Sequence, residues 1–404
     1  MAVGNVDFPS MKKVSGIRLG TSNAGIKQTE RDDILVVEMA EGTTCAGVFT
    51  QNAFCAAPVN IAKDHLQQNP RWLLVNSGNA NAGTGKQGMS DATTSCVSLA
   101  SIVGGTGSQV LPFSTGVIGE NLPIEKIAAA LPKAVNFLQE HGWSKAAHAI
   151  MTTDTFAKGA SLIVNIDGHP VTVTGISKGA GMIQPNMATM LGFVATDAKM
   201  NQTLLQKCIS EAVDQSFNRI TVDGDTSTND ACILMASGCS SAAEITENSG
   251  NYLIFAKAVM DVCKRLAELI VRDGEGATKL MRIRVEQAAN DAEAVMVGKT
   301  IAHSPLVKTA FFASDPNWGR ILAAIGRSGI EQMALDKVET YLDDVCIVKH
   351  GERADSYTEA KGQHVMNQEE ILVRVVLGRG QATQEVLTCD LSYDYVRINA
   401  EYRT

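Results

Sequence analysis

Thr189 is the residue of this chain whose type and surroundings most directly suggest chemistry. Residues 178–193 read KGAGMIQPNMATMLGF, so Thr189 follows a segment rich in glycine and turn residues and precedes an apolar run. A threonine hydroxyl is a poor nucleophile alone, but its own α-amine can act as the activating base once the preceding peptide bond is cut. A free α-amine has a pKa of roughly 7.7–8.0, so a good part of it is neutral at working pH. On this pattern alone, a loop that enters a core strand is the commoner explanation.

A second candidate is the segment Ser114-Thr115-Gly116, which follows the short apolar segment 110–113. A threonine and a glycine at the end of a strand offer a hydroxyl and a close backbone N–H that point the same way. Together they could stabilise a developing negative charge as an oxyanion hole. The alternative is an ordinary turn, which the residues alone favour.

A third candidate, Glu275, lies between Gly274 and Gly276, just after the longest helical pattern of the sequence, residues 252–271. The apolar residues of that pattern recur on one face, and Gly274 suits the position that follows the end of a helix. A carboxylate just past a helix C-terminus meets an unfavourable dipole. This placement suggests that Glu275 is kept for a purpose, although a solvated loop glutamate is the more common case.

The glycines and the turn before Thr189 must bend the chain into place. Gly179 and Gly181 can adopt positive φ without penalty, and Pro185-Asn186 fits the centre of a tight turn. The apolar run that continues to Ala195 reads as a buried strand. We therefore expect Thr189 at the border between a sharp bend and a core strand.

Hydrophobic periodicity and turn residues predict the remaining elements. We expect strands at 34–39 and 46–50, which would pair, and at 72–75, 220–222, 278–285, 371–377 and 384–387. A hairpin joins 161–166 to 171–174 around Asp167-Gly168. Helices are expected over 91–102 with Ser90 as cap, over 123–139, over 201–217 with Asn201 as cap, over 252–271 and over 291–303. The last residues, 397–404, read as a strand-like run that is tied down.

Two segments resemble ligand-binding motifs but break their rules. Gly85-Lys86 lies in a glycine-rich loop, yet the phosphate-loop pattern would need a glycine at Ala80 and a hydroxyl residue at Gln87. Residues 223–230, DGDTSTND, hint at calcium, yet the obligatory glycine and the final glutamate of that pattern are Thr228 and Leu234. We expect a hydrogen-bonded loop beside the site instead.

The composition excludes several classes of protein. The 404 residues suffice for two or three domains, and a formal charge of −8 without basic blocks argues against nucleic acid as a partner. The nine cysteines form no CxxC pair and are odd in number, which predicts reduced thiols in the cytoplasm. The seven histidines form no HxxxH or HExxH motif, so no zinc site is expected. We expect no signal peptide, transit peptide or membrane-spanning segment.

Several segments, in the same order and over nearly the whole chain, resemble the ornithine acetyltransferase, or glutamate N-acetyltransferase, family of arginine biosynthesis (the ArgJ family). They are 178–193 together with 76–81 (NSGNAN), 114–119 (STGVIG), 151–155 (MTTDT), 223–230 (DGDTSTND) and 315–320 (DPNWGR). No catalytic position departs from the family pattern. The resemblance implies an α/β enzyme with a four-layer αββα sandwich, similar in logic to N-terminal nucleophile hydrolases.

The resemblance also implies that the precursor cuts itself between Ala188 and Thr189. The α chain, 1–188, and the β chain, 189–404, would remain together, and the family suggests an α2β2 assembly. The implied domains are a main nucleophile domain, 1–280, and a smaller C-terminal α/β domain, 281–404, whose tail returns to the active site.

The implied reaction moves the acetyl group of N²-acetyl-L-ornithine to L-glutamate by a ping-pong route through an acetyl ester on Thr189. The family pattern assigns Thr115 and Gly116 to the oxyanion hole. It assigns substrate contacts to Thr152, Lys178, Thr189, Glu275, Asn399 and Thr404. Lys178 is the obvious partner of a substrate carboxylate. No metal or bound cofactor is implied, and whether acetyl-CoA is a second acetyl donor stays open.

Two alternatives also stay open. An N-terminal nucleophile aminopeptidase or amidohydrolase of the same fold would release the acyl group to water instead of glutamate. A non-enzymatic module that binds small anions would use the glycine-rich loops and would run as one intact chain on a denaturing gel.

Overall fold

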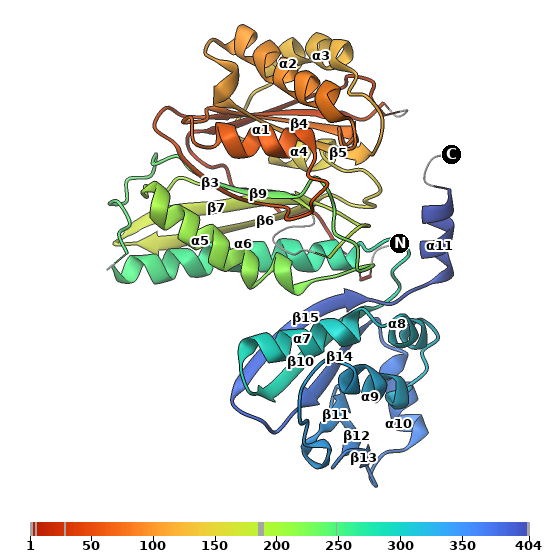
Figure 1. Ribbon diagram of the computed structural model, residues 1–404. Coiled ribbons are helices and arrows are strands. Elements are labelled where there is room, and N and C mark those ends of the chain that lie inside the picture. The colour runs from red at the N-terminus through yellow and green to blue at the C-terminus, as the bar shows by residue number, and fades with distance from the viewer. Residues whose placement is uncertain (1–2, 5, 28–29, 185–189, 248, 402–404) are drawn as a thin grey trace.

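Two β-sheets lie face to face at the centre of the larger part of the molecule (Figure 1). The computed structural model describes residues 3–4, 6–27, 30–184, 190–247 and 249–401. The first sheet has the order β1-β2-β4-β5, with β1 Ile17–Ser22, β2 Ile34–Met39, β4 Trp72–Asn79 and β5 Val110–Val117. The second has the order β3-β9-β8-β7-β6, with β3 Thr44–Phe49, β9 Ala231–Ala236, β8 Leu191–Thr196, β7 His169–Lys178 and β6 Lys158–Ile166.

Apolar side chains from the facing sides of the two sheets form the core between them. Val75 and Phe113 of the first sheet share one buried cluster with Phe193 and Ile233 of the second. The rings of Phe113 and Phe193 meet edge to face, with their centroids 5.2 Å apart. The parallel strands β8 and β9 are buried along their whole length, because both of their faces are covered. The buried strand predicted after Thr189 is confirmed as β8.

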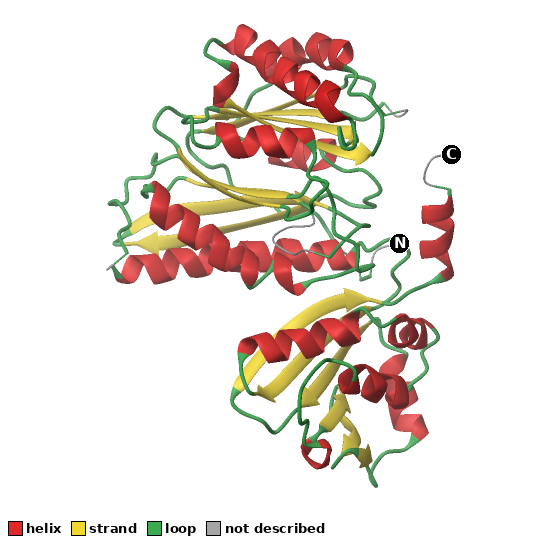
Figure 2. Ribbon diagram, viewed as in Figure 1, coloured by secondary structure: helices red, strands yellow, loops and turns green. Residues whose placement is uncertain are grey.

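Helices cover the outer face of each sheet, as the red ribbons on either side of the yellow strands show in Figure 2. The first sheet is covered by α2 Gly85–Val103 and α3 Ile124–Asn136, with α1 Ala57–His65 packed against α2 and β5. Helix α4 Trp143–Ala149 packs instead into the core between the two sheets, against β1 and β7. The second sheet is covered by α5 Gln202–Asp214 and α6 Gly250–Arg272. The layers therefore run helix, sheet, sheet, helix, and the expected αββα sandwich is confirmed.

A third sheet with a separate hydrophobic core follows the sandwich. Its order is β13-β12-β11-β14-β10-β15, with β10 Leu280–Ala288, β11 Glu339–Leu342, β12 Val345–Lys349, β13 Glu352–Arg353, β14 Glu370–Val376 and β15 Ala382–Cys389. Its helices are α7 Asp291–Ala302, α8 Pro305–Phe312, α9 Trp318–Gly326 and α10 Glu359–Met366. Short 3₁₀ turns lie at η1 Gly107–Gln109, η2 Phe217–Arg219 and η3 Leu335–Lys337. The last helix, α11 Tyr393–Ala400, leaves the third sheet and extends towards the sandwich (Figure 1).

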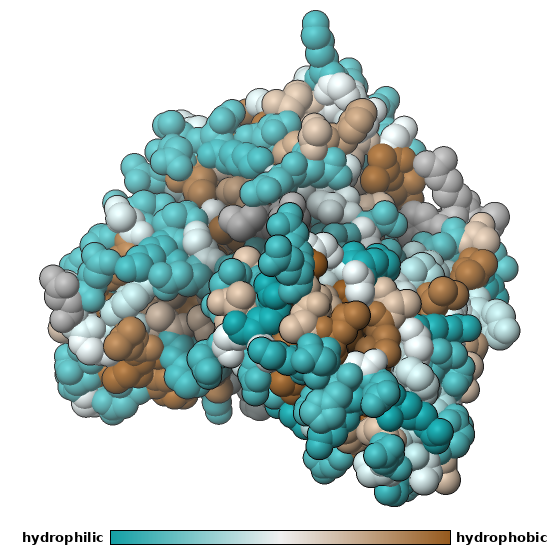
Figure 3. All heavy atoms as spheres, turned by 60° about the horizontal axis from the view of Figure 1, so that its bottom comes forward, coloured by the Kyte–Doolittle hydropathy of each residue, from teal (hydrophilic) through white to brown (hydrophobic). Residues whose placement is uncertain are grey.

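Charged side chains join the third sheet to the sandwich. Arg272, at the end of α6, lies 2.7 Å from Glu268 and 2.6 Å from Glu370 of β14, and Arg282 of β10 lies 2.9 Å from Glu268. The rest of the surface seen in Figure 3 is mainly hydrophilic, with hydrophobic side chains in small separate groups. No helix in the described ranges has the length and apolar character needed to cross a lipid bilayer.

Some predicted elements are wrong because they depend on distant partners. The strands expected at 34–39 and 46–50 both form, but they do not pair with each other: β2 pairs with β1 and β4, whereas β3 pairs with β9. The expected strand 220–222 forms only an isolated bridge between Ile220 and Leu387. The strand-like tail is instead the helix α11 up to residue 400.

The helix predicted at 91–102 begins earlier, at Gly85, so the expected cap Ser90 lies inside the helix and Thr84 stands at its N-cap position. Its first turn is polar and mostly exposed, so the apolar period from which a helix is read starts only later. Two other expectations are confirmed: the hairpin of β6 and β7 turns at Asp167 and Gly168, and the Asn201 side chain caps α5 by accepting the Leu204 N–H.

Candidate active site

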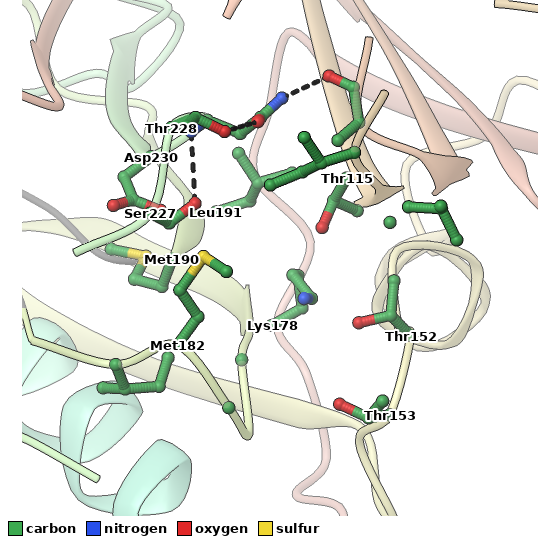
Figure 4. Close-up of a pocket in the computed structure, with 18 of the residues that line it drawn as sticks. Thr115, Thr152, Thr153, Lys178, Met182, Met190, Leu191, Ser227, Thr228 and Asp230 are labelled. Carbon is green, nitrogen blue, oxygen red and sulfur yellow. Dashed lines mark hydrogen bonds between the residues drawn. The ribbon is translucent and has the colours of Figure 1, made fainter. Parts of the chain in front are cut away.

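A cavity of about 230 Å³ opens at the ends of β5 and β7, where several distant chain segments meet (Figure 4). Six of the residues that the sequence singles out line it: Thr115, Gly116, Thr152, Lys178, Glu275 and Asn399. Ala188, Thr189, Thr404 and the expected turn at Pro185-Asn186 lie outside the described residues. Met190, the residue after Thr189, is buried and lines the same cavity, so the chain reaches the cavity wall directly after the candidate nucleophile.

The candidate oxyanion pair lies at the end of β5, where Thr115 is opposite Ser77 and Gly116 is opposite Gly78 of β4. Gly116 has φ +136°, and a Cβ at this position would lie 2.3 Å from the carbonyl carbon of Gly78. A side chain is therefore excluded at Gly116. Figure 4 shows Thr115 facing the same space as Lys178 and Thr152. The Thr115 hydroxyl and the backbone at Gly116 thus both face a position where a substrate oxygen atom could bind.

Buried polar side chains hold the end of β5 in place. Asn229 Nδ2 donates hydrogen bonds to the carbonyl oxygens of Ala80 (2.5 Å) and Ser114 (2.9 Å), and Ser114 Oγ donates to Asn76 Oδ1 (2.6 Å). Each of these buried polar groups has a hydrogen-bond partner in another, so the network holds the end of β5 in one well-defined position.

The loop at 223–230 is hydrogen-bonded and lies beside the cavity, as expected from the sequence. Asp223 accepts the N–H groups of Met182 (2.6 Å) and Ile183 (2.8 Å). Burial raises the pKa of Asp223, and these N–H donors act against that shift. The acidic residue that hinted at calcium thus orders the glycine loop that forms one cavity wall.

Lys178 ends β7 and brings a cation to the cavity. Its side chain is buried, and its Nζ lies 4.0 Å from Asp154 Oδ2. Burial lowers the pKa of Lys178, while the negative charges of Asp154, Asp230 and Glu275 oppose that shift. An ammonium that has lost much of its hydration is a strong partner for a carboxylate that enters the cavity.

Glu275 is buried against the glycine loop rather than solvated. Its N–H donates to the Ala180 carbonyl oxygen (2.8 Å), and a Cβ on Gly181 would lie 2.3 Å from Glu275 Oε2. Of the two glycines that could adopt positive φ without penalty, Gly179 does so, at +150°, and Gly181 does not. Gly181 is needed instead because it leaves room for the carboxylate.

Helix α11 brings Asn399 to this carboxylate: Asn399 Nδ2 donates a hydrogen bond to Glu275 Oε2. Ser392 begins the helix, accepts the Tyr395 N–H and donates from its hydroxyl to the Gly276 carbonyl oxygen. Gly276 has φ +70°, and a Cβ there would lie 2.4 Å from the Tyr395 nitrogen. The close approach of α11 thus depends on the glycine after Glu275.

Sequence reasoning assigned no role to three charged residues beneath the cavity. Lys158 Nζ lies 2.6 Å from Asp154 and 2.5 Å from Asp273, and none of the three side chains is exposed. The spacing of Asp154 and Lys158 was visible in the sequence, but an acid and a base four residues apart usually form a solvated pair. Only the burial of both side chains distinguishes this pair from an ordinary solvated ion pair.

Comparison with known proteins agrees with this geometry. The sequence model of the ArgJ family matches residues 18–404. The arginine biosynthesis bifunctional protein ArgJ of Methylococcus capsulatus (strain Bath) is 64% identical over 391 residues, which cover 97% of this chain and 96% of that protein. The protein of the same name from Pseudomonas fluorescens is 54% identical over 407 residues, and the alignment covers 100% of this chain and 100% of that protein.

A solved structure gives the same result for part of the chain. The crystal structure of the arginine biosynthesis bifunctional protein argJ from Bacillus halodurans aligns with a TM-score of 0.50 and 43% identity. The alignment covers 52% of this chain and 98% of that one.

Proposed function

The chain belongs to the ArgJ family, and from this premise we propose that it is an acetyltransferase that moves the acetyl group of N²-acetyl-L-ornithine to L-glutamate in arginine biosynthesis. One observation carries the proposal. A single cavity is lined by the Thr115–Gly116 pair, by the buried cation of Lys178 and by Met190, which directly follows Thr189. An acyl transfer to Thr189 would need oxyanion donors and a partner for a substrate carboxylate, and both lie beside the residue that follows this candidate nucleophile.

The first step of the proposed mechanism is self-cleavage. The Thr189 hydroxyl attacks the carbonyl carbon of Ala188, the C–N bond breaks, and the amine of Thr189 takes up the proton. Water then opens the resulting ester and leaves a free carboxylate on Ala188. The length of the Bacillus halodurans chain supports this step, since a fragment that begins at Thr189 would also make up slightly more than half of this chain.

The second step is acetyl transfer to Thr189. The α-amine of Thr189, directly or through water, takes the hydroxyl proton while Oγ attacks the acetyl carbonyl carbon. The Thr115 hydroxyl and the Gly116 N–H stabilise the oxyanion. Ornithine leaves with the proton, and the acetyl group remains as an ester on Thr189. The amine of glutamate then attacks this ester by the reverse sequence, which restores the free threonine.

The charged groups of the cavity suit these two substrates. Lys178 binds a substrate carboxylate, while Glu275 and Asn399 bind the opposite end together with Thr152 and Thr404. No metal and no bound cofactor takes part in the proposed reaction. The catalytic unit would consist of the main domain, 1–280, with the C-terminal domain, 281–404, supplying the tail.

The names of the two relatives describe a bifunctional protein, which favours a second activity, the acetylation of glutamate with acetyl-CoA as donor. We place the enzyme in the cytoplasm as an α2β2 assembly. None of its nine cysteines, all of which lie in the described part of the chain, forms a disulfide, in keeping with a reducing compartment.

An assay with two acetyl donors tests the proposal. Purified protein is incubated with glutamate and either N²-acetyl-L-ornithine or acetyl-CoA, and N-acetylglutamate is quantified. Transfer from acetylornithine is the required result. Free acetate in place of N-acetylglutamate would indicate the amidohydrolase alternative, and an uncut chain without either activity would indicate an anion-binding module.

A further inference from the structure

One carboxylate beneath the cavity contacts three groups on the same cavity wall. Asp154 Oδ1 accepts a hydrogen bond of 2.7 Å from the Gly179 N–H, and Oδ2 accepts one of 2.9 Å from the Thr152 N–H. Oδ2 also lies 4.0 Å from the Lys178 ammonium. We infer that Asp154 is a positioning residue for acetyl transfer, because it fixes Lys178, Thr152 and Gly179 relative to one another. This inference rests on the function proposed above.

Asp154 is itself held from behind, so it cannot turn away from the cavity wall. Lys158 Nζ donates to Asp154 Oδ1 at 2.6 Å and to Asp273 Oδ2 at 2.5 Å. Asp273 accepts the Thr155 N–H at 3.0 Å and also the Thr155 hydroxyl, and it caps the C-terminal end of α6. Both oxygens of Asp154 are therefore engaged, and the network ends on the longest helix of the sandwich.

The charges of this network balance as a set. Two carboxylates, Asp154 and Asp273, face two ammonium groups, Lys158 and Lys178, and little solvent reaches them. Burial acts to raise the pKa of Asp154, but Lys158 and Lys178 outweigh it and hold that pKa well below its usual range. Asp154 is thus ionised at any working pH.

Several charged groups act on Lys178. Asp154, Asp230 and Glu275 favour its protonated form, whereas Lys158 and Lys27, from the loop between β1 and β2, disfavour it. Asp154 makes the largest of these contributions. Loss of its charge would lower the pKa of Lys178 further and would leave two buried ammonium groups that repel each other.

A misplaced Lys178 should affect binding more than the chemical step. An ammonium that holds a substrate carboxylate contributes equally to the bound substrate and to the transition state, so its loss raises KM. Displacement of a positioning group by about 1 Å can cost up to about 10²-fold in rate. A substitution of Asp154 should therefore raise KM and lower the rate of transfer. A general loss of stability would not produce this pair of effects in the protein that remains folded.

The test compares Asp154→Asn with two matched controls in the cleaved enzyme. Asp154→Asn keeps the shape and removes the charge, so kcat/KM should fall roughly 10- to 100-fold, mainly through KM. The alkaline limb of its kcat/KM profile should move to lower pH. Asp273→Asn also removes a partner of Lys158, but among the described residues the Asp273 side chain bonds only Thr155 and Lys158, neither of which lines the cavity, so it should lower Tm without moving that limb. Asp197→Asn, a buried aspartate at the far end of β8 that accepts the Thr172 N–H, should keep wild-type kinetics.

Two results would overturn the inference: a wild-type KM and pH profile in Asp154→Asn, or an equal kinetic effect in Asp273→Asn. If Asp154→Asn does not fold, the double variant Asp154→Asn/Lys158→Gln restores the net charge of the buried set and should show the same kinetic loss. Wild-type kinetics in the double variant would also overturn the inference. Absence of acetyl transfer in the wild type would instead reject the proposed function, and this inference with it.

Discussion

The side-chain amide of Asn399 donates a hydrogen bond of 2.9 Å to Glu275 Oε2, although 124 residues separate the two in the sequence. This bond brings the last helix to the cavity. Asn399→Ala should raise KM for acetylornithine by about tenfold, because Glu275 would lose the hydrogen bond that orients its carboxylate in the cavity. Glu275→Gln should do the same, and the double variant should lose less than the product of the two effects. Arg397→Ala, on the exposed side of α11, is the control, and independent effects of the two substitutions would contradict the prediction.

Thr115→Val should slow acetyl transfer with little effect on substrate binding. The substitution keeps the shape of the side chain and removes one oxyanion donor, which typically costs roughly 10²–10³ in kcat. Steady-state kinetics on protein that has been shown to be cleaved measures this effect. Thr115→Ser, which keeps the hydroxyl, should retain most of the activity. An unchanged kcat in Thr115→Val would remove Thr115 from the mechanism.

Gly116→Ala and Gly119→Ala form a matched pair that separates steric clash from backbone strain. Both glycines have positive φ, +136° and +86°, but a Cβ at Gly119 meets nothing within 4 Å, whereas a Cβ at Gly116 meets the backbone of Gly78. Gly119→Ala should therefore lower the free energy of unfolding by about 1–3 kcal/mol. Gly116→Ala should cost more and should also reduce activity, as thermal unfolding and kcat measurements would show. Equal stability losses would mean that the end of β5 can shift.

The pH dependence of kcat/KM should reflect the lowered pKa of Lys178. Only the ammonium form binds a carboxylate, so kcat/KM should fall as the pH rises through a pKa below the ordinary 10.5. For stability the sign is opposite: a buried ammonium opposes folding below its folded-state pKa, and this cost disappears as the pH rises above 10.5. Lys178→Arg, whose guanidinium stays charged, should lose this alkaline limb. A limb that persists in Lys178→Arg would have to be assigned to another group.

The two roles proposed for Thr189 can be separated by substitution. Thr189→Ala should remain a single chain and be inactive, because both cleavage and transfer need the hydroxyl. Thr189→Ser should cleave at least in part and show reduced activity, since serine lacks the methyl group that restricts the threonine rotamer. N-terminal Edman sequencing of the second fragment of the wild-type protein should read Thr-Met-Leu-Gly-Phe. An uncut wild-type chain with full transferase activity would disprove the N-terminal nucleophile mechanism.

Elements whose signals are local could be predicted from the sequence. Asp167 and Gly168 both adopt positive φ, at 51° and 88°, as a two-residue hairpin requires. The apolar stripe of α6 and the Asn201 cap of α5 are likewise set by residues a few positions apart. The pairing of β2 and β3 could not be predicted in this way, since each strand is apolar and the choice of partner depends on the whole fold.

The residues of the candidate site also differ in how far the sequence could predict them. Short motifs such as 114–119 could be assigned to the cavity through the family resemblance, whereas the residues alone favour an ordinary turn. The ion pairs of Lys158 with Asp154 and Asp273 join a loop, a strand and a helix end, and no local pattern specifies such a set. Helix α11 was missed because eight residues show little periodicity, although Ser392 was a usable N-cap signal.

The order of the second sheet determines what a cut before Thr189 does to the folding of the protein. Strands β3, β7 and β6 precede the cut and β9 and β8 follow it, so in the order β3-β9-β8-β7-β6 the strands of one fragment enclose those of the other. The fragments cannot part without opening the β3–β9 and β7–β8 ladders, which is to unfold the sandwich. An uncut precursor would fold as one chain at a rate independent of concentration, whereas an enzyme cut at the proposed site would have to reassemble from two molecules. The proposed cleavage would thus exchange reversible folding for kinetic persistence, and the rate of unfolding would set the lifetime of the active enzyme.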